Sequence, residues 1–449
     1  MRQLRHLPWA CQLCGPLRFL ECSDLIVRSA EAAWPRVARF LLSIALAARF
    51  CFFEPTFAAD TPDGAVVERG RYLAVAGDCV SCHTRAGGVP FSGGLAFSTP
   101  FGIVHSTNIT PDPQSGIGQW TQTDFERALR QGVGHDGEHL YPVFPYPSFT
   151  KTSDADVAAL WAFLRSIPPV KYTAPANDMT FPFGQRWLIG VWKRLYFKEG
   201  RFVTDQSKPA EWNRGAYLVE GLGHCGACHS PRNFLGAEDS AQAMTGGALK
   251  EDMGGRSMAW SAVNLTSSSS GLNSWSMEDL TNYLKLGYAP HASVFGPMNS
   301  VVMNSTRRLT HADDRAIATY LKSLTAKKQD SGTPSGSQIM ADGETLYSIH
   351  CGTCHLPTGL GSISTGPPLA GSAVVLAADP ASLINVTLGG PELPSTAPSD
   401  EWQSRKWQAM PAFSEKLSDD EVAALLSYIR NSWGNKEGAV SADQVSKQR

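Results

Sequence analysis

The chain has 449 residues, of which 43% are hydrophobic and 18% charged, and its formal net charge at pH 7 is −2. That length is enough for about three domains of ordinary size. The near-neutral charge provides no basic excess of the kind that attracts nucleic acid, so we expect no nucleic-acid partner.

Residues 1–59 have the pattern of a signal peptide. Arg36 and Arg39 precede an apolar run over 40–53, and the small residues that end at Ala59 suit cleavage before Asp60. The segment is long for a signal peptide, which suggests a true translation start near Val37. A retained membrane anchor is the alternative, although the run is short of the roughly 20 apolar residues that a transmembrane helix needs. Residues 1–59 hold seven arginines and four acids, so the mature chain carries about −2 − 3 = −5.

The string Cys-x-x-Cys-His occurs three times after this segment. The residues are Cys79, Cys82 and His83, then Cys225, Cys228 and His229, then Cys351, Cys354 and His355. This is the attachment signature of a c-type haem, in which two thiols form thioether bonds and the histidine becomes the proximal iron ligand. A zinc site would need a second ligand pair, and a redox dithiol would need a βαβ setting. Neither surrounds these motifs, so the sequence predicts three covalently bound haem c groups.

Each motif lies between two helical segments. The leading segments are 68–75, 212–219 and 343–349, and the closing helices begin with the capping-box patterns Ser153-Asp-Ala-Asp156, Thr310-His-Ala-Asp313 and Ser418-Asp-Asp-Glu421. The first two copies share a middle section with helices at 124–130 and 278–286, and the shorter third copy has 384–387 in its place. Two crossing helices with aromatic packing are how a small cytochrome c closes over its haem. We therefore predict a mainly α fold of three tandem class I cytochrome c-like domains.

These domains are expected at residues 60–172, 209–326 and 339–434. Between the first two, residues 173–208 form a linker with an aromatic and basic helix at 183–197. We interpret that helix as interdomain packing, with a docking surface for a partner or for lipid headgroups as the alternative. Residues 327–338 are expected to be a flexible connector, and residues 435–449 a polar tail.

Iron that only carries electrons usually has a second axial ligand, and a methionine thioether raises its reduction potential. In the second copy Met298 follows Gly296-Pro297 and suits this role, with Met303 as its rival. In the third copy Met410 precedes Pro411 and has no nearby rival. We also expect Arg232 to hold a haem propionate. The loop at 366–369 is expected to bring a proline carbonyl to the free N–H of the proximal histidine.

The first copy has no methionine between Cys79 and Met179, and Phe144 stands where a ligand would be expected. Phenylalanine cannot bind iron. Three options remain: five-coordinate iron, a histidine (His105, His135 or His139), or Met179 reaching in from the linker. We favour five-coordinate or weakly ligated iron, which predicts a high-spin ferric signal from about one haem in three.

The sequence resembles the triheme cytochrome c subunits of membrane-associated bacterial dehydrogenases that oxidise alcohols, gluconate and related sugars. The carrying strings are Arg69-Gly-Arg-Tyr72, Asn108-Ile-Thr-Pro-Asp112, Pro145-Tyr-Pro-Ser-Phe-Thr150, Gly223-His-Cys-Gly-Ala-Cys-His-Ser-Pro-Arg232, Gly296-Pro-Met298, Pro367-Pro-Leu-Ala-Gly371 and Met410-Pro-Ala-Phe413. The similarity covers about residues 61–444. In that family a methionine occupies the place of Phe144, so this chain departs from the pattern at its first haem.

The resemblance implies an electron-transfer subunit rather than an enzyme. A separate catalytic subunit with a flavin or quinone cofactor would oxidise the substrate. This chain would relay the electrons to ubiquinone or another respiratory acceptor from the periplasmic side of the cytoplasmic membrane, which it would touch only peripherally. Two alternatives are a peroxidase-like or ligand-binding protein that uses an open first haem, and a free periplasmic electron carrier.

Overall fold

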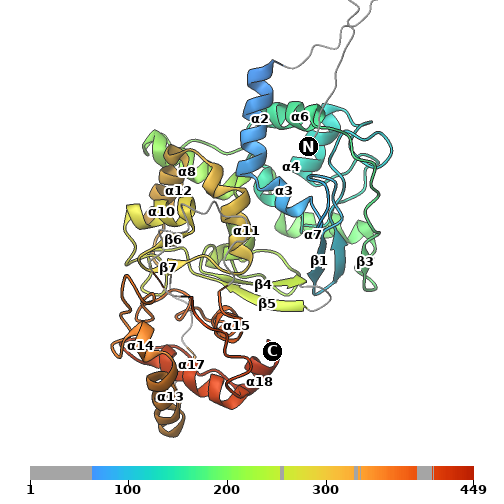
Figure 1. Ribbon diagram of the computed structural model, residues 1–449. Coiled ribbons are helices and arrows are strands. Elements are labelled where there is room, and N and C mark those ends of the chain that lie inside the picture. The colour runs from blue at the N-terminus through green and yellow to red at the C-terminus, as the bar shows by residue number, and fades with distance from the viewer. Residues whose placement is uncertain (1–62, 253–256, 328–331, 334, 392–406, 408) are drawn as a thin grey trace, which may run out of the picture. The chain divides into compact units, whose positions relative to one another are not determined.

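The computed structural model describes residues 63–252, 257–327, 332–333, 335–391, 407 and 409–449 (Figure 1). The predicted signal peptide, its cleavage site and the alternative anchor lie outside the described residues, as does part of the connector at 327–338. Residues 62–449 form one unit. In the described part of the chain, no helix is both long and apolar enough to cross a membrane.

The described residues are mostly helical with little strand, which confirms a mainly α protein. The first region, 63–172, contains α2 (Gly64–Ala76), α3 (Cys79–Cys82), α4 (Gln122–Gln131), α5 (Tyr146–Phe149) and α6 (Asp154–Ser166). The linker carries α7 (Arg186–Tyr196). The second region, 209–326, contains α8 (Ala210–Tyr217), the π-helical turn η1 (Leu218–Leu222), α9 (Gly226–His229), the 3-10 turns η2 (Ser240–Gln242) and η3 (Thr306–Arg308), α10 (Met277–Leu286), α11 (Pro297–Asn304) and α12 (His311–Ser323). The third region, 337–449, contains α13 (Ser337–His350), α14 (Gly352–His355), α15 (Ala381–Gly389), α17 (Asp419–Asn431) and α18 (Ala442–Ser446).

One helix crossing recurs in all three regions, where α2 packs on α6, α8 on α12 and α13 on α17. Each leading helix places a glycine at the crossing. A Cβ at Gly70 would lie 1.9 Å from the carbonyl oxygen of Ala159, and the corresponding distances are 1.9 Å for Gly215 and 2.2 Å for Gly343. Only glycine therefore allows these helices to approach so closely. An aromatic residue of the closing helix lies against each glycine: Phe163, Tyr320 and Tyr428.

The capping boxes expected at the closing helices form only in the third region. There Ser418 and Glu421 cap each other reciprocally. In α6 and α12 the hydroxyl of Ser153 or Thr310 accepts the expected backbone N–H. The carboxylates of Asp156 and Asp313, however, turn to other partners, so the expectation of a full box was wrong for these two helices. Each carboxylate accepts hydrogen bonds from an arginine of its own region and from a tyrosine of the other region.

Short strands that we did not anticipate brace the helices. Strands β1 (Ala96–Thr99), β2 (Gly102–His105) and β3 (Asp178–Met179) form an antiparallel sheet in the order β1-β2-β3. The pairing Ile103–Asp178 ties the linker to the first region. In the second region β4 (Gly247–Asp252) pairs with β5 (Ser257–Ala262), and β6 (Tyr288–Ala289) with β7 (Ala292–Ser293).

The third region docks on the β4–β5 hairpin through polar contacts. Ser382 of α15 exchanges hydrogen bonds with Ser261 of β5, and the Asn385 amide donates to the carbonyl of Ala259 at 2.7 Å. The predicted polar tail is folded onto this region, because Val440 and Val445 are buried. One hydrophobic cluster runs through the first two regions, whereas a separate cluster fills the third.

Candidate haem-attachment sites

Each predicted cysteine pair lies on a single helical turn. Helix α3 begins at Cys79 and ends at Cys82. Helix α9 begins directly after Cys225 and contains Cys228, and α14 begins directly after Cys351 and contains Cys354. A spacing of three residues on a helix puts both thiols on one face. None of the six thiols is in a disulfide. The two thiols of each pair are therefore available for thioether bonds to one planar group, so that the three pairs would hold three such groups.

The proximal histidines share one hydrogen-bond arrangement. The ring Nδ1 lies 2.6 Å from the Thr107 carbonyl oxygen in His83, 2.8 Å from that of Val263 in His229, and 2.8 Å from that of Pro367 in His355. A carbonyl only accepts, so Nδ1 carries the hydrogen and the lone pair stays on Nε2, the atom that would bind iron. The proline carbonyl expected for the third histidine is confirmed. Sequence reasoning did not find Thr107 and Val263.

Burial sets the protonation of these groups. It lowers the pKa of all three histidines, against the opposing effect of the carbonyl contacts, so the rings stay neutral. It raises the pKa of the Cys79, Cys225 and Cys351 thiols to about 12. Among the described residues no cluster of three or more His, Cys, Asp or Glu side chains could hold a metal ion.

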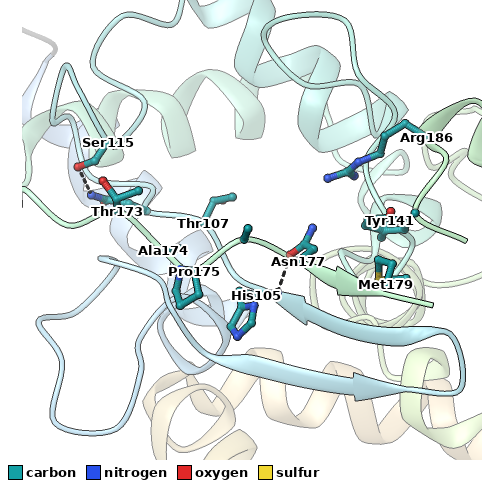
Figure 2. Close-up of a pocket in the computed structure, with 13 residues that line it drawn as sticks. His105, Thr107, Ser115, Tyr141, Thr173, Ala174, Pro175, Asn177, Met179 and Arg186 are labelled. Atoms are coloured by element: carbon teal, nitrogen blue, oxygen red, sulfur yellow. Dashed lines mark hydrogen bonds between the residues drawn. The ribbon is translucent and has the colours of Figure 1, made fainter. Parts of the chain in front are cut away.

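A cavity of about 560 Å³ lies beside the first motif, between the segments 105–115 and 173–186 (Figure 2). Thr107, whose carbonyl accepts from His83, lines it together with His105, Tyr141 and Met179. The Nδ1 atom of His105 is buried without a hydrogen-bond partner. Two of the four side chains considered for the sixth position of the first haem, His105 and Met179, thus border one cavity.

The other two histidines are engaged elsewhere. His135 stacks on Trp120 and its Nδ1 lies 3.3 Å from Asp124. His139 packs under α7, with its Nδ1 3.2 Å from the Lys193 amine. Phe144 packs against Phe149 at a ring-centroid distance of 5.4 Å. Neither His135 nor His139 is among the residues that line the cavity.

The structure also separates the two methionines considered in the second region. The Met303 sulfur accepts a contact from the Arg307 guanidinium at 3.7 Å. Met298 lies in the first turn of α11 and packs against the core. The choice of Met298 as the ligand stays a prediction. Met410 packs against the core of the third region, so it also stays a prediction.

Arg232 is held by backbone carbonyls of its own loop. Its guanidinium donates to Ala227 and Gly236, each at 2.8 Å, and lies 3.9 Å from Glu238. These bonds hold the side chain near Cys228. Burial raises the pKa of the Cys228 thiol, and the positive charge of Arg232 partly offsets that rise. A role at a haem propionate stays a prediction.

The first two motifs lie against each other, which the sequence did not indicate. Burial raises the pKa of Cys82 to about 12, and its thiol lies close enough to Cys228 of the second motif for the two groups to interact electrostatically. The amide of Asn304 donates to Ser81 of the first motif at 2.9 Å. His224, next to Cys225, is buried beside the Gly77 carbonyl and contacts Phe149. In the sequence, only the position of His224 directly before the second motif could have pointed to this residue.

Three cysteine pairs on helical turns, each followed by a histidine whose Nε2 is free, define a c-type cytochrome. Family models agree with this. The model for cytochrome c matches residues 67–168, and that for subunit III of cbb3-type cytochrome c oxidase matches residues 338–429. The chain therefore carries covalently bound haem c and functions in electron transfer.

Known relatives identify the family. The chain is 41% identical to the cytochrome c subunit of the quinone-type alcohol dehydrogenase of Gluconobacter oxydans, over 87% of this chain and 84% of that protein. It is 38% identical to the gluconate 2-dehydrogenase cytochrome c subunit of Pantoea cypripedii, over 87% and 91%. A 42% match to a nicotinate dehydrogenase subunit of Pseudomonas putida covers 82% of this chain but only 30% of that longer protein. The chain belongs to the family of cytochrome c subunits of dehydrogenase complexes, which confirms the resemblance drawn from the motifs.

Proposed function

We propose that the chain is a triheme electron relay with three tandem class I cytochrome c domains at 60–172, 209–326 and 339–434. The observation that carries this is the threefold recurrence of one local arrangement. In each region a cysteine pair occupies one helical turn, and the next residue is a histidine bonded through Nδ1 to a backbone carbonyl. The same glycine-mediated helix crossing accompanies each copy.

Each side chain has a distinct part in this proposal. Haem c, when bound, supplies a one-electron iron couple. The cysteines anchor it at Cys79 and Cys82, at Cys225 and Cys228, and at Cys351 and Cys354. The backbone carbonyls orient the histidine rings and make Nε2 more basic. Met298 and Met410 provide thioether ligands that raise the potential, and Arg232 faces a propionate.

The first site is assigned an open or weakly bound sixth position. Phe144 cannot bind iron, and of the four candidate ligands only His105 and Met179 are among the residues that line the adjacent cavity. Electron paramagnetic resonance of the oxidised chain should show a high-spin ferric signal from about one haem in three. A purely low-spin spectrum would exclude the open site. In that case, loss of a low-spin signal in His105→Ala or in Met179→Leu would identify the ligand.

The partner in this proposal is a catalytic dehydrogenase subunit, because two relatives are named as cytochrome c subunits of an alcohol dehydrogenase (quinone) and of a gluconate 2-dehydrogenase. We propose that this partner carries a flavin or quinone cofactor. Electrons would leave to ubiquinone or another respiratory acceptor. The complex would lie on the periplasmic side of the cytoplasmic membrane, attached peripherally. Affinity purification from the native cells should recover a large dehydrogenase with this chain. Recovery of the chain alone would instead favour a free carrier.

Haem stoichiometry is the decisive test. Intact mass and a pyridine haemochrome assay of the processed chain should give three haems per polypeptide. The variants Cys82→Ala, Cys228→Ala and Cys354→Ala should each weaken or abolish attachment at one site and leave the other two loaded. Two haems in the unmodified chain, or a variant that loses none, would contradict the proposed count.

A further inference from the structure

The most exposed apolar side chains of the described residues include several on and beside α7. Phe181 is 88% exposed, Trp187 64% and Leu195 65%. Phe234 is 85% exposed, and its loop adjoins α7 because the Trp192 indole donates to the carbonyl of Leu235 at 3.0 Å. Exposed aromatics gathered along one helix mark an interaction site rather than ordinary surface variation.

Helix α7 has two distinct faces. Its inner face holds Arg186, Gly190 and Lys193. Arg186 donates to the His139 carbonyl at 2.8 Å, and the Lys193 amine donates to the carbonyls of Gln131 and Gly132 at 2.6 Å. Gly190 lets the helix pass close to the His139 ring. These contacts fix the rotation of the helix and leave the opposite face toward the solvent.

The outer face carries an apolar stripe with cations. Trp187, Val191 and Leu195 recur at the four-residue spacing that keeps side chains on one face, and all three are exposed. Arg194 and Lys198 are exposed beside them, and neither makes an ion pair within the described part of the chain. Residues 186–196 contain no acid, although the chain as a whole has net charge −2. This face is therefore a local cationic and aromatic surface on an acidic protein.

We propose that the outer face of α7, with Phe181 and Phe234 beside it, is the surface by which the chain lies on an anionic lipid bilayer. The inference rests on the proposed peripheral membrane attachment and names the surface responsible. A helix with Lys or Arg along an apolar face of Trp and Leu is typical of interfacial binding. Trp favours the headgroup level because its ring is apolar and its N–H is polar. The exposed cations match the negative charge of acidic phospholipids.

The test is vesicle co-sedimentation of the purified haem-loaded chain. Vesicles of phosphatidylcholine with about 30% phosphatidylglycerol should bind it, and pure phosphatidylcholine should bind it more weakly. The triple variant Trp187→Ser/Val191→Ser/Leu195→Ser should partition at least about tenfold more weakly. Arg194→Gln/Lys198→Gln should lower binding to the anionic vesicles and leave binding to the neutral ones unchanged.

A matched control exists in the third region. Ile363, Ile339 and Leu360 are 64%, 43% and 63% exposed, against 64%, 42% and 65% for Trp187, Val191 and Leu195. Their triple serine variant should bind vesicles like the unmodified chain. Equal losses in both triple variants, or no vesicle binding by the unmodified chain, would overturn the proposal. The proposal would also be overturned if the α7 triple variant kept its binding to vesicles and lost only its binding to the purified dehydrogenase subunit. That result would make this face a protein interface. Haem content and reduction by dithionite, measured on every variant, test the electron-relay proposal separately.

Discussion

The joint between the first two regions differs in kind from the joint with the third. In the first pair, Tyr72 donates to Asp313 and Tyr217 donates to Asp156, each at 2.5 Å. The contacts are reciprocal, because each region lends a tyrosine to the cap of the other region's closing helix. We call these four residues the tyrosine latch.

Among the described residues of the third region there is no such exchange. The tyrosine of its leading helix, Tyr347, donates to the carbonyl of Leu356 in its own region at 2.6 Å. The arginines that pair with the latch carboxylates directly precede the crossing glycines of the first two regions, whereas Asp342 holds that position before Gly343. The comparison teaches that similar local repeats can form one shared core or a separately packed one, depending on a few polar side chains. We expect the first two regions to unfold together and the third to unfold separately.

The largest effect should come from the glycines of the helix crossings. Because a methyl group at Gly343 would lie 2.2 Å from a backbone carbonyl, Gly343→Ala should cost about 3 kcal/mol. The loss should stay within the third region. Gly70→Ala should cost as much and destabilise the first two regions together. Hydrogen exchange read by mass spectrometry resolves the regions. Gly64→Ala is the control in the same helix as Gly70, because nothing lies within 4 Å of that position.

Removal of a latch carboxylate should rank second. Asp156 is buried and bonds both Arg69 and Tyr217. Asp156→Ala should therefore cost about 2 kcal/mol, since it leaves a buried phenol and a cation without their partner. Denaturant unfolding should show the loss in the first two regions. The matched change Glu421→Ala, at an exposed capping box, should have a smaller effect confined to the third. Equal effects would mean that the latch does not join the regions.

Removal of single latch hydroxyls should have a smaller effect. Tyr72→Phe and Tyr217→Phe should each cost about 1–2 kcal/mol and keep the ring. Each removes a hydrogen bond to a carboxylate and one that the hydroxyl accepts from the backbone N–H of Thr310 or Ser153. A double-mutant cycle of Tyr72→Phe with Asp313→Asn should give a coupling energy well above zero. Tyr347→Phe serves as the comparison and should leave the first two regions unchanged. A coupling energy near zero would show that the short contact carries no stability.

The smallest expected effect is on the pH dependence of stability at low pH. Burial alone would raise the pKa of Asp313, but hydrogen bonds from Arg214 and Tyr72 outweigh it and hold the pKa below its ordinary value. A lowered carboxyl pKa adds stability above the ordinary value of about 3.9, and that stability is lost as pH falls through the folded pKa. Asp313→Asn should remove this part of the pH dependence below about pH 4. If the variant loses stability below about pH 4 as the unmodified chain does, that loss comes from other carboxyl groups.

The sequence by itself determined what depends on neighbours along the chain. The cysteine and histidine spacing identified the cofactor chemistry, because a thioether pair and its proximal ligand fit on one helical turn. The helices that bracket each motif followed from their apolar spacing, and α2, α8 and α13 begin two to six residues before the expected positions.

Only the tertiary structure decided which distant groups meet. The pattern at Ser153 and Asp156 indicated a local capping box, but Arg69 and Tyr217 bind that carboxylate more strongly than one backbone N–H can. The acceptors for His83 and His229 lie 24 and 34 residues away along the chain. The polar segment after residue 434 buries Val445 because α17 offers it an apolar surface. Local rules cannot rank such partners, because the competing group is brought close only by the folded chain.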